Sequence, residues 1–120
     1  MIAWETTYTV LYQYKAKLDR IIDGDTVDAW IDLGFDTWVH KRIRLEGIDT
    51  PETRTRDLEE KRAGLAAKAR LEALLGPKDS EFILHSNDLD KYGRVLGVLW
   101  VEEKNINEVL LLEGHAEVYK

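Results

Sequence analysis

The sequence predicts an α+β fold that is mainly β: a small five-stranded barrel with two to three helices. Three observations favour it. Apolar and polar residues alternate with period two before residue 46, helical spacing replaces this alternation between about residues 58 and 75, and short apolar segments return afterwards. This order of strands, helix, strands and helix indicates how the barrel is built.

The first half of the chain is expected to form three strands. Residues 8–22 are rich in Tyr, Val, Leu and Ile. After Asp23-Gly24-Asp25, a second strand with one buried face is indicated by alternating apolar residues, namely Val27, Ala29, Ile31 and Leu33. Gly34 marks a turn, and residues 37–45 form a third strand whose one face carries Trp38, His40, Arg42 and Arg44. The short turns imply an antiparallel meander.

The second half begins with a helix over residues 58–75, which Gly76-Pro77 ends. Residues 82–85 and 95–101 are two further strands. Asn105 or Asn107 then caps a second helix that runs to Gly114, with Glu108 as a capping-box partner for Asn105. Three strands, a helix, two strands and a helix fit an OB-fold-like barrel.

Length and composition limit the classes of protein. The 120 residues suit one domain over 1–120. The absence of cysteine excludes disulfides, zinc–thiolate sites and cysteine nucleophiles. No segment approaches the roughly 20 apolar residues of a membrane span, so no membrane partner is expected. The N-terminal residues 1–5 have neither a basic leader nor an apolar signal core, which predicts a cytoplasmic protein or one whose signal was already removed.

The net charge of −6 argues against non-specific coating of nucleic acid. The charge is uneven, however: residues 41–70 carry nine basic and six acidic groups, whereas acidic groups dominate on both sides of this stretch. A focused phosphate site is therefore compatible with the composition.

Two acidic turns are candidates for a metal site. Asp23-Gly24-Asp25-Thr26 precedes the second strand and is, taken alone, a common solvated turn. Its spacing excludes an EF-hand, because position twelve is Gly34. Residues 44–52, Arg-Leu-Glu-Gly-Ile-Asp-Thr-Pro-Glu, place three acidic groups and an arginine at the end of the third strand. If both turns lie at one end of the barrel, their carboxylates could share Ca²⁺ or Mg²⁺.

Asp90-Lys91-Tyr92-Gly93-Arg94 is compatible with a plain hairpin turn, and also with a loop that presents an arginine and an aromatic ring to a phosphorylated nucleotide. The three histidines are scattered and are expected to be surface or hydrogen-bonded residues. Trp30, Trp38 and Trp100 are interpreted as core or barrel-wall residues rather than base-stacking platforms.

These motifs together resemble the staphylococcal nuclease family. The resemblance covers about residues 15–119 and rests on five motifs in order: D-G-D-T, R-L-x-G-I-D-T-P-E, a helix with G-x-x-A-K (residues 64–68), D-K-Y-G-R, and N-x-x-L-L-x-x-G-H-A (residues 107–116). It implies an OB-fold nuclease that binds one Ca²⁺ and hydrolyses phosphodiester bonds of single-stranded DNA and RNA to leave 3′-phosphate products. A monomer is expected.

The resemblance also implies roles for single residues. Asp25, Asp49 and the backbone carbonyl of Thr50 would bind the metal. Glu52 would contact the attacking water, and Arg44 and Arg94 would bind the scissile phosphate. Lys91 and Tyr92 match residues that touch the nucleotide's other phosphate.

The sequence departs from the family pattern near its end. The best-known members continue into a third helix, and they carry a base-stacking tyrosine for which Tyr119 is the nearest candidate here. Two other classes remain as alternatives. One is a non-catalytic OB-fold nucleic-acid binding module, although such modules usually lack the carboxylates or arginines that this chain retains. The other is a calcium-stabilised interaction domain, which would leave Arg44 and Arg94 without a task.

Overall fold

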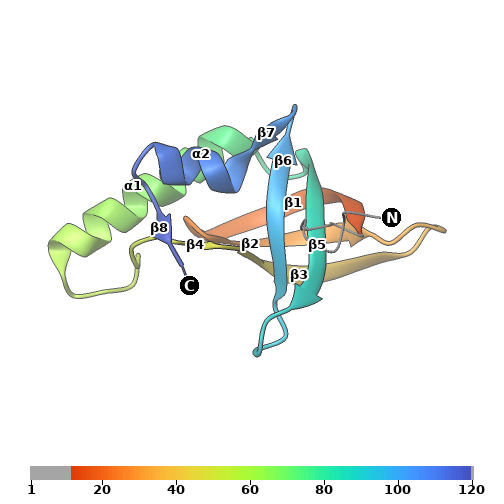
Figure 1. Cartoon of the computed structure of the whole chain (residues 1–120), viewed down its shortest axis with the longest axis horizontal. Helices are drawn as coiled ribbons and strands as arrows, with labels where there is room; N and C mark the ends of the chain where they lie inside the picture. The colour runs from red at the N-terminus through yellow and green to blue at the C-terminus, as the bar shows by residue number, and fades with distance from the viewer. Residues whose placement is uncertain (1–11, 120) are drawn as a thin grey trace, which may run out of the picture.

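A computed structural model of the chain describes residues 12–119. Five strands form a closed barrel (Figure 1): β1 (Gln13–Asp23), β2 (Thr26–Asp32), β3 (Trp38–Leu45), β5 (Glu81–Leu89) and β6 (Val95–Val101). Neighbouring strands pair in the order β3-β2-β1-β5-β6 and are antiparallel. A parallel pairing of β3 with β6 closes the barrel. The predicted α+β, mainly β barrel and its antiparallel meander are confirmed.

The remaining elements are short strands and two helices. The helices are α1 (Leu58–Leu75) and α2 (Ile106–Leu112), and the short strands are β4 (Ile48–Asp49), β7 (Lys104–Asn105) and β8 (Glu117–Val118). β4 pairs with β8 and lies outside the barrel sheet. The predicted limits of α1 and β6 agree with the structure, and residues 8–11 of the first predicted strand lie outside the described residues.

The core is filled by the inward-facing half of each strand. On β2 the side chains of Val27, Ala29 and Ile31 are buried, as the alternation predicts. Helices α1 and α2 contribute the buried Leu71 and Leu110 to the same cluster. Burial of a side chain of this size stabilises the fold by about 1.5–3 kcal/mol, so the barrel and both helices share one core.

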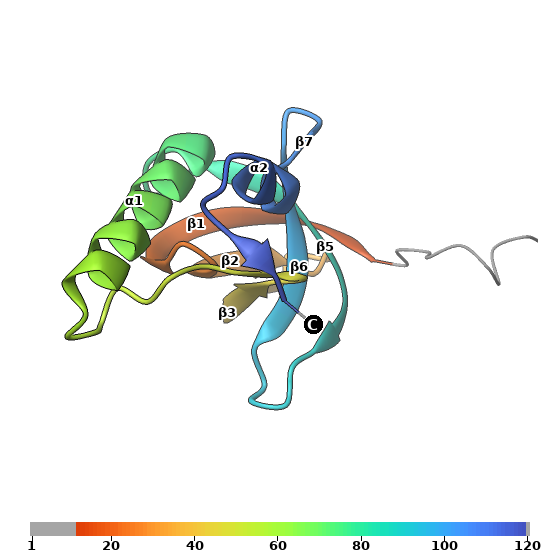
Figure 2. The same cartoon turned by 60° about the vertical axis from the view of Figure 1, so that its left-hand side comes forward.

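Helix α1 begins at a polar cap and ends at a glycine. The side chain of Asp57 accepts hydrogen bonds from the backbone N–H groups of Glu59 and Glu60 at 3.0 and 3.2 Å. Gly76 closes the helix with a backbone hydrogen bond to Glu72 O. The helix lies across one end of the barrel, beside α2 (Figure 2). Neither described helix is long and apolar enough to cross a membrane.

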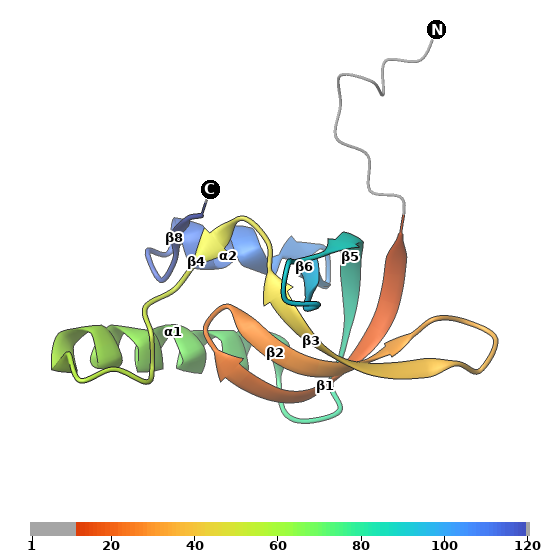
Figure 3. The same cartoon turned by 90° about the horizontal axis from the view of Figure 1, so that it is seen from below.

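The loop of the β2–β3 hairpin and helix α1 lie at opposite ends of the molecule (Figure 3). The hairpin loop, residues 33–37, projects away from β4, β8 and α1, as Figure 3 shows. The start of β2 and the end of β3 therefore lie beside β4, where the two acidic turns of the sequence meet.

Candidate functional site

The first acidic turn is held by hydrogen bonds to the second. Asp25 is buried, and its carboxylate accepts hydrogen bonds from the Thr26 hydroxyl at 2.9 Å and from the backbone N–H of Thr50 at 3.0 Å. The backbone carbonyl of Asp25 accepts a hydrogen bond from Leu45 N at 2.8 Å. The sequence expectation that the Asp25 and Asp49 turns lie at the same end of the barrel is therefore met.

Arg44 joins the two acidic residues. Its side chain leaves β3 on the same face as that of Arg42 and is only 11% exposed. Nη1 donates to the backbone carbonyls of Leu45 and Ile48, both at 2.8 Å. Nη2 lies 3.3 Å from an oxygen of Asp25 and 3.1 Å from one of Asp49. One guanidinium nitrogen thus contacts both carboxylates and offsets part of the repulsion between them.

The Asp49 turn is fixed by the last described residues. β4 pairs with β8 so that Ile48 faces Val118 and Asp49 faces Glu117, and Tyr119 N donates to Gly47 O at 2.9 Å. The ring of Tyr119 consequently lies over the Arg44 guanidinium, 5.4 Å from ring centre to Cζ. No periodicity could predict β4 or β8, because each has only two residues.

The electrostatics of Asp49 favour a cation. Burial raises the pKa of the Asp49 carboxyl above its usual value, and the negative charge of Asp25 raises it further, against the opposing effect of Arg44. A divalent cation would relieve this repulsion.

The available donors also suit Ca²⁺. They are the carboxylate oxygens of Asp25 and Asp49 and the backbone around Thr50, and hard oxygens are the ligands that Ca²⁺ takes. Within residues 12–119, no three or more His, Cys, Asp or Glu side chains gather as a metal cluster. Completion of the coordination sphere would therefore need backbone, water or substrate oxygens in addition to this pair.

Small residues on α1 allow both turns to pack against the helix. A Cβ atom at Gly64 would lie 2.5 Å from the backbone oxygen of Glu52 and 2.7 Å from that of Pro51. A Cβ atom at Gly24, in the first turn, would lie 2.8 Å from Cβ of Ala67. The G-x-x-A-K motif thus has a physical explanation: its glycine and alanine seat the two acidic turns on one helix.

The D-K-Y-G-R loop is ordered by its aspartate. Asp90 accepts hydrogen bonds from the backbone N–H of Tyr92 and of Arg94, both at 2.8 Å, and pairs with the Arg94 side chain. Burial would raise the pKa of Asp90, but these hydrogen bonds outweigh it and lower the pKa. The Tyr92 ring is exposed, with Lys91 Nζ 5.2 Å and Arg94 Cζ 5.5 Å from its centre.

Six of the eight predicted site residues line one cavity of about 240 Å³. Its lining includes both candidate arginines, the carboxylates and the Thr50 turn, namely Asp23, Asp25, Thr26, Arg44, Asp49, Thr50, Pro51, Glu52, Arg94 and Tyr119. A neighbouring cavity of about 450 Å³ shares residues 49–52 with it and extends toward Glu60, His115 and Glu117. Lys91 and Tyr92 line neither cavity; they precede Arg94 in the loop between β5 and β6.

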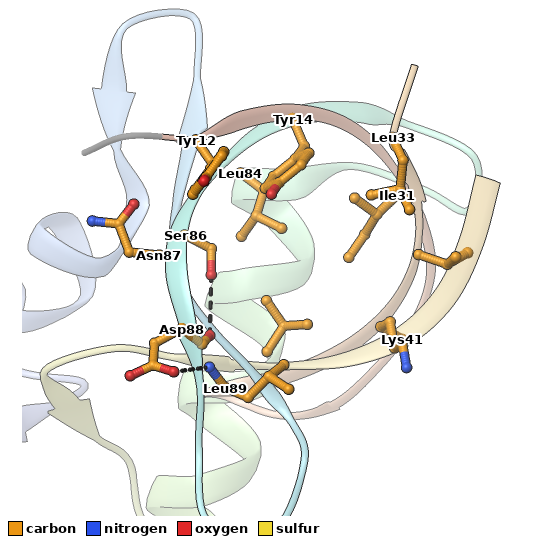
Figure 4. A pocket seen from close by; sticks show the side chains of 12 residues that line it. Tyr12, Tyr14, Ile31, Leu33, Lys41, Leu84, Ser86, Asn87, Asp88 and Leu89 are labelled. Atoms are coloured by element: carbon orange, nitrogen blue, oxygen red, sulfur yellow. Dashed lines mark hydrogen bonds between the residues drawn. The ribbon is translucent and has the colours of Figure 1, made fainter. Parts of the chain in front are cut away.

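A third cavity, of about 320 Å³, opens at the far end of the β2–β3 hairpin (Figure 4). Its wall is largely apolar, with Tyr12 and Tyr14 on one side and Ile31 and Leu33 on another. Among the described residues that line it, no pair of carboxylates lies beside an arginine, so the first cavity remains the candidate site.

Sequence reasoning missed one residue that supports the site. Asn107 is buried; its amide donates to Glu46 O at 2.9 Å and to Gly97 O at 3.1 Å, and its oxygen accepts from Leu99 N at 3.1 Å. It therefore ties α2 and β6 to the turn that precedes Asp49. The cap of α2 is Asn105, whose side chain accepts from Glu108 N at 3.0 Å; of the two candidate caps, Asn107 does not have this role.

The sequence of the chain is similar to a known family and to several known proteins. A sequence model described as "Staphylococcal nuclease homologue" matches residues 42–120. "Protein ParB" of Escherichia coli is 32% identical over 118 residues, covering 90% of this chain and 59% of that protein. The "SPbeta prophage-derived endonuclease YokF" of Bacillus subtilis is 35% identical over 102 residues, covering 84% of this chain and 33% of that protein.

A third relative, the "Thermonuclease" of Staphylococcus intermedius, is 35% identical over 97 residues, covering 81% of this chain and 55% of that protein. The chain thus spans between a third and three fifths of the length of these curated relatives. The match of the family model extends over most of the chain and includes Arg44, Asp49, Glu52 and Arg94. The chain belongs to the staphylococcal nuclease family.

Proposed function

We propose that the chain is a Ca²⁺-dependent nuclease that hydrolyses phosphodiester bonds of single-stranded DNA and RNA and leaves 3′-phosphate products. The observation that carries the proposal is the convergence of the two candidate metal-binding aspartates, a glutamate and two arginines on one cavity. The relatives that are named endonucleases and a thermonuclease support it.

The metal would be held by Asp25, Asp49 and the backbone carbonyl of Thr50. When bound, Ca²⁺ supplies a Lewis acid that polarises a phosphate oxygen and stabilises negative charge in the transition state. The fit rests on the all-oxygen donor set and on the raised pKa of Asp49, which burial causes first and the neighbouring charge of Asp25 second; a cation would relieve the repulsion between the two carboxylates.

Glu52 is the proposed general base. It is exposed at the border of the two adjoining cavities, and its own backbone N–H faces a carboxylate oxygen of Glu60 at 3.5 Å. In this position its carboxylate can orient or deprotonate a water for in-line attack on phosphorus. Its place on the loop that packs on Gly64 fixes the distance to the Asp49 turn.

Arg44 and Arg94 are the proposed phosphate ligands. Both line the cavity, and guanidinium groups match the equatorial oxygens that gain charge during attack. Arg94 is held by Asp90 and Arg44 by two backbone carbonyls, so both are oriented before substrate arrives. Lys91 and Tyr92 precede Arg94 in the same loop and would contact a neighbouring phosphate of the nucleic acid.

Incubation with denatured DNA and with RNA, each with Ca²⁺ and with a chelator, tests the proposal. We expect cleavage only with Ca²⁺, faster for single strands than for duplex, and products that end in a 3′-phosphate. Cleavage in every condition would refute the metal requirement. Binding without cleavage would identify the chain as a non-catalytic nucleic-acid module.

A further inference from the structure

Four cross-strand rows of side chains lead away from Arg44 along the outside of the barrel. The register pairs Arg44 with Thr26, Arg42 with Asp28, His40 with Trp30, and Trp38 with Asp32. Strand β1 extends two of these rows, because Arg20 pairs with Asp28 and Lys17 with Trp30. The alternate residues of β2 and β3, such as Ile31 and Val39, face the barrel interior instead. We use the name tryptophan face for six outward side chains on these rows: Lys17, Arg20, Trp30, Trp38, His40 and Arg42.

Two tryptophans on this face are exposed to an unusual degree. They belong to the barrel wall, as the sequence indicated, but their side chains lie on its outer surface: Trp30 is 45% and Trp38 is 38% exposed. Each is held by a polar neighbour, Trp30 by the His40 ring at 4.9 Å between centroids and Trp38 by Lys17 Nζ at 5.4 Å. Exposed, oriented indole rings are the platforms on which nucleic-acid bases stack.

Cations lie beside the tryptophans, in the row between Trp30 and Arg44. Arg42 binds both oxygens of the Asp28 carboxylate and Arg20 binds one of them, and the two guanidiniums lower the pKa of Asp28, Arg42 more than Arg20. Two guanidiniums against one carboxylate leave this row with one net positive charge. The side chains of Arg20 and Arg42 remain 65% and 44% exposed, so they keep edges that face solvent. The acidic groups of the surroundings are Asp19, Asp23 and Asp32. Asp19 is already paired with His40 and Lys78, and Asp23, whose charge acts on Arg42, accepts a hydrogen bond from the Thr53 hydroxyl.

We propose that the tryptophan face binds the part of a single-stranded nucleic acid that extends beyond the cavity. Bases stack on Trp30 and Trp38, and phosphates pass Lys17, Arg20 and Arg42. The inference rests on the proposed nuclease function, because Arg44 is both the last member of the outward face of β3 and part of the cavity. This continuity, together with exposed rings and cations on one face, favours a strand over a protein partner, which would need a larger apolar patch.

The dimensions fit a short stretch of strand. Six residue steps separate Arg44 from Trp38, which corresponds to about 20 Å along β3. An OB-fold covers roughly four nucleotides at the lower end of its range. Because stacking tolerates every base, the face should increase affinity for long substrates without selecting a sequence.

Binding of a fluorescent eight-nucleotide oligo(dT) tests the inference by anisotropy in the presence of Ca²⁺. The measurement uses the Glu52→Gln background, so that the proposed loss of cleavage does not consume the probe. We expect Trp30→Ala and Trp38→Ala each to weaken binding by about tenfold, and Trp30→Phe and Trp38→Phe to restore most of it. Tyr12→Ala is the matched control, since it removes an exposed ring at the third cavity and should leave affinity unchanged.

Thymidine 3′,5′-bisphosphate separates the two proposals, because it is too short to reach the face. Its dissociation constant should be the same in the Trp→Ala variants and in the parent. Equal oligonucleotide affinity in parent and double Trp→Ala variant would overturn the inference, and so would an equal loss of bisphosphate affinity, which would indicate damage to the fold. The nuclease proposal fails separately, by absence of cleavage in the chain with Glu52 intact.

Discussion

Replacement of Gly64 by alanine should test how tightly helix α1 positions the catalytic loop. At an ordinary helix position this change stabilises a protein, because glycine is about 1 kcal/mol less favourable than alanine. Here the new Cβ would lie 2.5 Å from Glu52 O, whereas ordinary contacts begin at 3.4 Å. The neighbouring atoms are backbone, so they cannot rotate away as the end of a side chain would.

The loop that carries Glu52 must therefore move by about 0.9 Å, the difference between these two distances. A displacement of about 1 Å at a reacting group can lower a rate by about a hundredfold. We expect the turnover rate of Gly64→Ala at saturating Ca²⁺ to fall by that order. Overpacking costs about 1–3 kcal/mol, which the helix gain partly offsets, so the free energy of unfolding should change by less than about 2 kcal/mol.

The assay combines hydrolysis of denatured DNA with a denaturant titration of the same variant. Leu65→Ala is the matched control, since Leu65 is the exposed neighbour in α1 and its loss leaves the loop untouched. The reasoning is wrong if Gly64→Ala is more stable than the parent by about 1 kcal/mol and cleaves at the parental rate, because the helix and loop would then not be in contact.

Four further substitutions should give distinct results. Asp49→Asn should raise the Ca²⁺ concentration for half-maximal activity, whereas Glu52→Gln should lower the rate at saturating Ca²⁺; a change in metal affinity alone for both would contradict the role of Glu52. Arg94→Lys keeps the charge but loses the bidentate fork, so hydrolysis should slow well beyond a twofold change, and near-parental activity would assign Arg94 to the hairpin alone. Asp28→Asn should lower the melting temperature at pH 7. Asp28 has a lowered pKa in the folded state, so its contribution is present above its unfolded pKa of about 3.9 and is lost as the pH falls through the folded value. Melting curves of parent and Asp28→Asn should therefore converge in acid, and a constant difference down to pH 2 would contradict this.

Local signals predicted the long elements but not the short ones. The limits of α1 could be predicted because Gly76-Pro77 ends a stretch of strong helix formers. Strand β5 is longer than the predicted residues 82–85, because its polar end lacks alternation. There Ser86 is buried and donates to Leu96 O and Asp88 O across an irregularity of register. These hydrogen bonds depend on the neighbouring strand β6, so the sequence around Ser86 alone could not predict that β5 continues there.

The residues of the candidate site could be named from motifs, but their connections could not. Asp25 and Asp49 are 24 positions apart, and only the barrel shows that one nitrogen of Arg44 reaches both. Asn107 looked like a helix cap because asparagine is common there, whereas its buried amide joins three segments that are distant in sequence. Long-range hydrogen bonds of this kind carry no periodic signal.

The proposed function gives Arg44 two tasks that depend on what occupies the cavity. In the structure its Nη2 atom contacts both Asp25 and Asp49 and offsets part of their repulsion, and its Nη1 atom donates to carbonyls of the β3–β4 turn. A cation bound by the two carboxylates would take over this compensation, and Nη2 would then be available to a phosphate oxygen. Because Nη1 keeps its backbone partners, the guanidinium would stay in place while its outer edge changes partner. We therefore expect the same geometry to stabilise the acidic pair before a metal binds and to orient the arginine for substrate afterwards, and we expect lysine, with a single ammonium group, to serve poorly at this position.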